Sequence, residues 1–94
     1  MSERTASALE RLDALLPALS ALPAEANRDQ LMEEATALRR AVAAFHMEAI
    51  RFRIHAVDRL LRLGGDAAEP RRLLEDVRQA LESAGFHTRS HVAP

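Results

Sequence analysis

The stretch that decides the fold is FHMEAIRFRIHAVDRLLRL, residues 45–63, which alternates apolar residues with arginines and holds two of the four histidines. It contains no glycine or proline, and neither does the run that precedes it back to Arg28. Glycine and proline are the residues that most often interrupt a helix. We therefore predict one uninterrupted helix over residues 28–63, which at a rise of 1.5 Å per residue would be about 54 Å long. So long a helix in a small domain is typical of a coiled coil or of self-association.

A shorter helix is predicted before the long one. Leucines recur every three or four residues between about residues 2 and 22, which is the spacing of one apolar stripe on a helix. Pro17 lies inside this segment and predicts a kink or a break, because proline removes an amide donor and clashes with the preceding turn. Asn27, followed three residues later by Gln30, has the pattern of a capping box and predicts where the long helix begins.

A second short helix is predicted after the glycine pair that ends the long one. It runs from about residue 66 to residue 84, with Asp66 as a cap and Gly85 as the stop. The fold class is therefore all-α: three helices, of which the very long central one is flanked by two shorter antiparallel helices. We expect a single helical domain over residues 1–86 and a flexible tail over 87–94.

The predicted long helix carries two apolar stripes when its residues are placed at 100° intervals. One stripe runs the full length, and its members are Leu31, Leu38, Val42, Phe45, Ala49, Phe52, Ala56 and Leu63. The other covers only the C-terminal half, and its members are Ala43, Met47, Ile50, Ile54, Val57 and Leu61. The half-length stripe suits the last helix, whereas the first helix is too short to cover all of the full-length stripe.

The uncovered part of the full-length stripe predicts an interface between two chains. Four residues there lack a partner within the chain: Phe45, Ala49, Phe52 and Ala56. Contiguous exposed apolar surface on a soluble protein marks an interaction site. We therefore expect a homodimer, in which two long helices pair antiparallel across a two-fold axis and form a larger bundle. The alternative is a monomeric three-helix bundle with a bent second helix.

A row of basic residues between the two stripes predicts a candidate anion site. Arg39, His46 and Arg53 are spaced seven apart and fall on one side of the predicted long helix. Such a row could hold a carboxylate or a phosphate, with the histidine as its titratable member. The alternative is that the two arginines extend to solvent or pair with acidic residues of neighbouring helices.

A second basic strip is predicted on the solvent-facing side, formed by Arg40, Arg51, His55 and Arg62. It is interpreted as a solvated face and not as a nucleic-acid surface. An exposed histidine in a helical bundle also allows histidine phosphotransfer, although the residues that follow His46 and His55 do not match the pattern of phospho-accepting helices. No histidine has enough neighbouring ligands for a metal site.

The composition limits the function classes further. The 94 residues carry a net charge of −1, no cysteine, no tryptophan and no tyrosine, and they contain no signal pattern or membrane-spanning apolar run. We expect a cytoplasmic protein that uses no cofactor or metal and binds neither nucleic acid nor membrane. The function expected is that of a non-enzymatic interaction or regulatory protein, with a second copy of itself or another protein as partner. The alternatives are a small bundle that binds or transforms an anionic ligand, and a phosphotransfer-like signalling protein.

Overall fold

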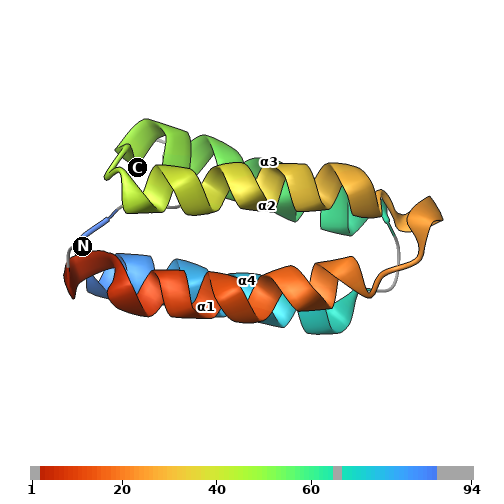
Figure 1. Ribbon diagram of the computed structural model, residues 1–94, viewed down its shortest axis with the longest axis horizontal. Helices are drawn as coiled ribbons and strands as arrows, with labels where there is room; N and C mark the ends of the chain where they lie inside the picture. Colours follow the sequence, from red (N-terminus) through yellow and green to blue (C-terminus); the bar gives the residue numbers. More distant parts are fainter. Residues whose placement is uncertain (1–2, 65–66, 87–94) are drawn as a thin grey trace, which may run out of the picture.

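The computed structural model describes residues 3–64 and 67–86, and within them the chain is all-helical. Four α-helices of similar length run alternately up and down, so that each is antiparallel to the next (Figure 1). A short 3-10 turn, η1, precedes the second of them. The elements are α1 (Glu3–Ser20), η1 (Ala24–Ala26), α2 (Arg28–Ala43), α3 (Met47–Leu63) and α4 (Ala68–Ser83). The predicted all-α class is confirmed.

The prediction of three helices with one very long central helix is wrong. The segment 28–63 forms two helices, α2 and α3, that fold back on each other at Ala44–His46. Phe45 adopts the left-handed conformation, with φ of 61°. The amide of Phe45 donates to the carbonyl of Val42 at 3.2 Å, and the amide of His46 donates to the carbonyl of Ala41 at 3.0 Å. This is a Schellman motif, the usual way to end a helix, with phenylalanine in the position that glycine normally occupies.

The burial of the α3 apolar side chains outweighs the cost of this turn. A left-handed residue that carries a Cβ costs about 1–2 kcal/mol. The turn lets α3 pack its own apolar face into the same core as α2, and that face is fully buried: Ile50, Ile54, Val57 and Leu61. Each such side chain contributes about 1.5–3 kcal/mol when it is buried. The gain from four of them is several times the cost of one strained residue.

An aromatic contact also joins the turn between α2 and α3 to the end of α4. The end of α4 has the same Schellman geometry, with Gly85 at φ of 97° and the Phe86 amide donating to the Leu81 carbonyl at 2.9 Å. Phe86 is buried, and its ring centroid lies 5.8 Å from that of Phe45. The two turns therefore lie at the same end of the bundle and pack on each other through their phenylalanines. The predicted stop at Gly85 is confirmed.

The other predicted boundaries are partly right. A kink or a break was predicted at Pro17, and α1 continues through it to Ser20, so the break does not occur. Asn27 precedes α2 but has a φ of 62° and makes no side-chain capping bond, so the predicted capping box is wrong. The left-handed conformation is one that asparagine tolerates better than most residues. Asp66 and the tail predicted over 87–94 lie outside the described residues.

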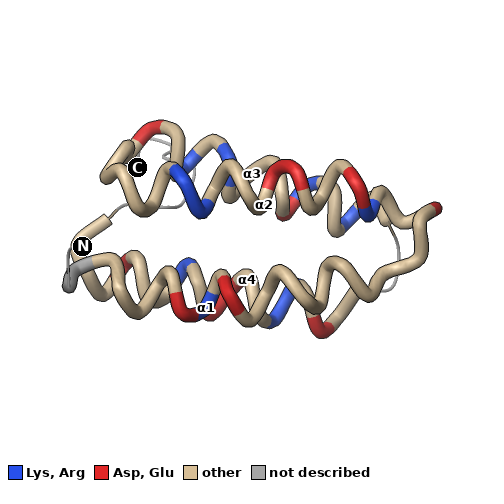
Figure 2. The backbone as a smooth tube through the Cα atoms, viewed as in Figure 1, with Lys and Arg blue, Asp and Glu red and all other residues tan. Residues whose placement is uncertain are grey.

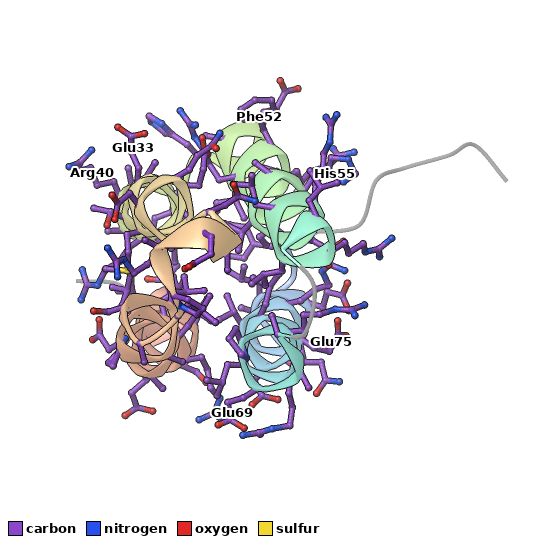
Figure 3. The ribbon with its side chains drawn as sticks, turned by 90° about the vertical axis from the view of Figure 1, so that its right-hand side faces the viewer. Glu33, Arg40, Phe52, His55, Glu69 and Glu75 are labelled. Carbon is purple, nitrogen blue, oxygen red and sulfur yellow. The ribbon has the colours of Figure 1, made fainter. Side chains whose placement is uncertain are left out.

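The core lies between the four helices, which occupy the corners of a square when viewed from the end (Figure 3). α1 packs against both α2 and α4, and α2 packs against α3, whereas α3 and α4 have the smallest contact of the four neighbouring helix pairs. Most of the largest fully buried side chains are leucines, and the set is Leu12, Leu15, Leu19, Leu31, Leu38, Val42, Ile50, Ile54, Val57, Leu61, Leu74 and Leu81. The leucine-rich filling follows directly from the scarcity of aromatic residues in the chain.

Charged residues of both signs occur on all four helices (Figure 2). Among the residues that the structure describes, no helix is both long and apolar enough to cross a membrane.

Candidate functional site

The outer face of α3 is a strip of exposed residues with a regular spacing. Its members, which we call the α3 strip, are Glu48, Phe52, His55, Arg59 and Arg62. Successive members are four, three, four and three residues apart, the spacing that keeps side chains in line along one side of a helix. Figure 3 shows Phe52 and His55 on the outer side of α3, away from the core. The α3 strip is therefore a surface that a second helix could follow.

Phe52 is the main apolar feature of this surface. Its relative exposure is 65 %, and Leu63 at the end of the same helix reaches 70 %. Single exposed apolar residues are common and need no explanation. Here the two lie on one helix, and half-buried Ala56 and Leu60 lie between them in the sequence, so the apolar surface is extended along α3.

Two open hollows flank Phe52. One, of about 360 Å³, is lined by Glu48, Arg51, Phe52 and His55. The other, of about 440 Å³, lies between α2 and α3 and is lined by Asn27, Gln30, Glu34, Phe52, His55, Ala56, Arg59, Leu60 and Leu63. The Phe52 ring thus forms a ridge between two shallow depressions, which is a shape that can interlock with a second surface of the same kind.

The position of the Phe52 ring is supported by Arg53. The guanidinium carbon of Arg53 lies 5.3 Å from the Phe52 ring centroid, within the range of a cation–π contact. The same guanidinium donates a 2.8 Å hydrogen bond to Glu34 of α2. The ring is therefore held by a cation that is itself fixed to the neighbouring helix, which reduces the conformational freedom that Phe52 would lose on binding.

The four residues predicted for the dimer interface are not in one row. Phe52 is exposed, and Ala49 and Ala56 are half-buried on the same helix. Phe45 lies in the turn before α3, where its ring contacts that of Phe86 and its relative exposure is 41 %. The break between α2 and α3 separates Phe45 from the other three, so only the α3 members can share one surface.

The three residues predicted for an anion site do not form one site. Arg39 donates to Asp13 of α1 at 2.8 Å, and this hydrogen bond lowers the pKa of the Asp13 carboxyl and raises the pKa of the guanidinium. Arg53 donates to Glu34, as described above. His46 is exposed at the start of α3. The regular spacing that aligned these residues exists only on a continuous helix, and the two arginines pair with acidic residues of different helices, α1 and α2.

The predicted basic strip is divided in the same way. Arg40 is on α2, whereas Arg51, His55 and Arg62 are on α3. Figure 3 shows Arg40 and His55 on opposite sides of the bundle. Arg62 is paired with Asp58 at 3.0 Å. The part of the strip that remains together is the one that surrounds Phe52.

The sequence reasoning missed the contribution of Glu48 and Arg59. Neither makes an ion pair with another described residue, and both are exposed, near opposite ends of α3. Their signal in the sequence was the alternating spacing of four and three residues around Phe52.

The described residues also contain no group of three or more histidine, aspartate or glutamate side chains that could hold a metal ion.

The α3 surface combines an exposed ring, shallow relief and charges of both signs, and these properties suit the binding of another protein surface. No protein-family model matches the chain, and no curated protein or solved structure gives a significant match.

Proposed function

We propose that this chain is a non-enzymatic interaction protein that forms a homodimer through the outer face of α3. The observation that carries the proposal is the 65 % exposure of Phe52 on a helix whose opposite face is fully buried. Burying a phenylalanine side chain contributes about 1.5–3 kcal/mol, so a pair of such rings is a substantial part of the free energy of a weak dimer. Aromatic residues are also enriched at the centres of protein interfaces.

The size of the surface favours a reversible dimer over an obligate one. α3 has 17 residues and is about 25 Å long. A typical stable interface buries about 800 Å² on each partner, which a single helix face of this length does not reach unless α2 also contributes. A reversible dimer is therefore expected, with a dissociation constant on the order of micromolar to tens of micromolar.

The proposal is tested by Phe52→Glu, which places a charge at the centre of the surface. The variant should remain folded by circular dichroism, because the side chain is exposed, and its mass by light scattering should be that of one chain. Ala14→Glu is the matched control, since Ala14 is an exposed alanine on α1. The proposal is refuted if the wild type and both variants have the mass of one chain at hundreds of micromolar.

A second candidate function is phosphotransfer through His55. The histidine is exposed near the middle of α3, with Arg51 and Arg59 one turn away on either side. Arginines at those positions would offset the charge of a phosphate on the imidazole. Incubation with a phosphorylated receiver domain would then give acid-labile phosphate on the wild type and none on His55→Gln. Equal labelling of both proteins, or none on either, would exclude this role for His55.

A further inference from the structure

The charges of the α3 strip are arranged asymmetrically along the helix. Glu48 is in its first turn, Arg59 is in its last third, and Phe52 and His55 lie between them. The remaining charged member, Arg62, is paired with Asp58 of the same helix. Neither Glu48 nor Arg59 is neutralised by a described neighbour. A partner surface that is basic where α3 is acidic, and acidic where α3 is basic, would pair both charges.

A second copy of α3 supplies that surface in only one of two orientations. In a parallel pair, Glu48 would face Glu48 of the second copy, and Arg59 would face Arg59. In an antiparallel pair, each Glu48 would face an Arg59. Like charges across an interface oppose association and opposite charges favour it.

The spacing of the α3 strip then fixes the register. Antiparallel helices pack with the alternating positions of one seam facing those of the other. If Glu48 faces Arg59 of the second copy, Phe52 faces His55, and the two-fold axis passes between residues 53 and 54. The exposed ring of each chain would pack on the imidazole of the other, and a Glu–Arg pair would close each end.

We propose that α3 pairs antiparallel with α3 of a second copy in this register, so that Glu48 meets Arg59 and Phe52 meets His55. This inference rests on the proposed function, because it specifies how the homodimer is built. It goes further in naming the orientation, the register and the four residues that select the partner.

Cysteine cross-linking tests the register directly, because the chain has no cysteine of its own. Glu48→Cys and Arg59→Cys are prepared separately, and each is oxidised alone and in an equal mixture. A disulfide requires Cα atoms about 4.4–6.8 Å apart. In the proposed register, two copies of residue 48 are separated by 11 residues along the helix axis, or about 16 Å, whereas residue 48 faces residue 59. Covalent dimers should therefore form in the mixture and not in either variant alone.

A matched pair on α2 controls for random collisions. Glu33→Cys and Arg40→Cys replace exposed charges on the neighbouring helix, and their mixture should give no more covalent dimer than either alone. Covalent dimers of Glu48→Cys alone would show a parallel pair and overturn the inference. If light scattering finds a dimer but no sample cross-links, the register is wrong and the proposed function stands. If the wild type has the mass of one chain, the proposed function fails and this inference with it.

Charge reversal provides a second measurement that needs no oxidation. Glu48→Arg or Arg59→Glu alone should weaken the dimer by about tenfold, because each creates two like-charged contacts. The double reversal should return the affinity to within about threefold of the wild type, because the pairs are restored with opposite sense. A double variant that is weaker than both single variants would overturn the antiparallel pairing.

Discussion

The left-handed turn at Phe45 can be tested with two substitutions at this position, to alanine and to glycine. Which of the two variants is more stable depends on whether the residue lies in a left-handed turn or in a helix. Phe45→Ala and Phe45→Gly both remove the ring and its contact with Phe86. They differ only in how they tolerate the φ of 61° that the backbone adopts at this position. The difference between them therefore reports the backbone and not the side chain.

The magnitudes follow from the structure. The ring is 41 % exposed, so its loss should cost about 2 kcal/mol in both variants, including the aromatic contact at 5.8 Å. Glycine relieves a left-handed strain of about 1–2 kcal/mol, and its greater freedom in the unfolded chain offsets part of that gain. Phe45→Gly should therefore be more stable than Phe45→Ala by about 1 kcal/mol. In a continuous helix, glycine would instead be less stable than alanine by about 1 kcal/mol.

The assay is urea unfolding followed by far-UV circular dichroism, since the chain has neither tryptophan nor tyrosine for fluorescence. The substitutions are made in a Phe52→Glu background, so that a dimer does not shift the apparent stability. Arg40→Ala and Arg40→Gly, at an exposed position inside α2, give the ordinary order with alanine more stable. If glycine is also the less stable residue at position 45, α2 and α3 form one helix and the turn is wrong.

Three further predictions concern the core and the ion pairs. Leu61→Ala should lower the free energy of unfolding by about 2–5 kcal/mol, because Leu61 is 1 % exposed. Leu63→Ala should change it by less than about 0.5 kcal/mol, because Leu63 is 70 % exposed. Urea unfolding measures both values. A double-mutant cycle of Arg53→Ala and Glu34→Ala should give a coupling of about 0.5–1 kcal/mol, because the 2.8 Å pair is only partly exposed, and a coupling near zero would contradict the hydrogen bond. The hydrogen bond from Arg39 lowers the pKa of Asp13 below the ordinary value of 3.8. The ionised carboxylate therefore stabilises the fold above that pH, and this contribution is lost as the pH falls through the lower pKa of the folded state. Asp13→Asn should therefore make the free energy of unfolding fall less steeply below about pH 3.8. If the wild type and the variant lose stability equally as the pH falls, the Arg39–Asp13 pair is contradicted.

The apolar periodicity of the chain predicted most of the helical structure. The leucine spacing located α1, and Gly85 marked the end of α4, where its positive φ shows why glycine is needed. The glycine pair after Leu63 marked the end of α3. These features are local, so they could be inferred from neighbouring residues alone.

The break between α2 and α3 was missed because it contains neither glycine nor proline. Its signal was a shift of the apolar stripe. In α2 the buried residues belong to the first predicted stripe, such as Leu38 and Val42, whereas in α3 they belong to the second, such as Ile54 and Val57. On a helical wheel, the centres of the two stripes are separated by more than about 100°. The change from one buried stripe to the other falls near residues 43–47. Two stripes on one helix were interpreted as two partners, but they are the core faces of two helices.

The candidate site could be predicted only in part, for the same reason. The exposure of Phe52 followed from its place on the stripe that the second half of the segment does not bury. The partner of Arg39 is Asp13, 26 residues away, and that pairing depends on how α1 packs against α2. Side chains that are brought together by packing cannot be identified from spacing along one helix.

The mass of the wild-type chain as a function of concentration tests the central claim, self-association through the Phe52 face, most directly. Sedimentation equilibrium from a few micromolar to several hundred micromolar should show the mass rising from 10.4 kDa toward twice that value. Phe52→Glu should remain at 10.4 kDa over the same range. A wild-type mass that stays at one chain throughout, or a Phe52→Glu variant that dimerises as strongly as the wild type, would contradict the claim.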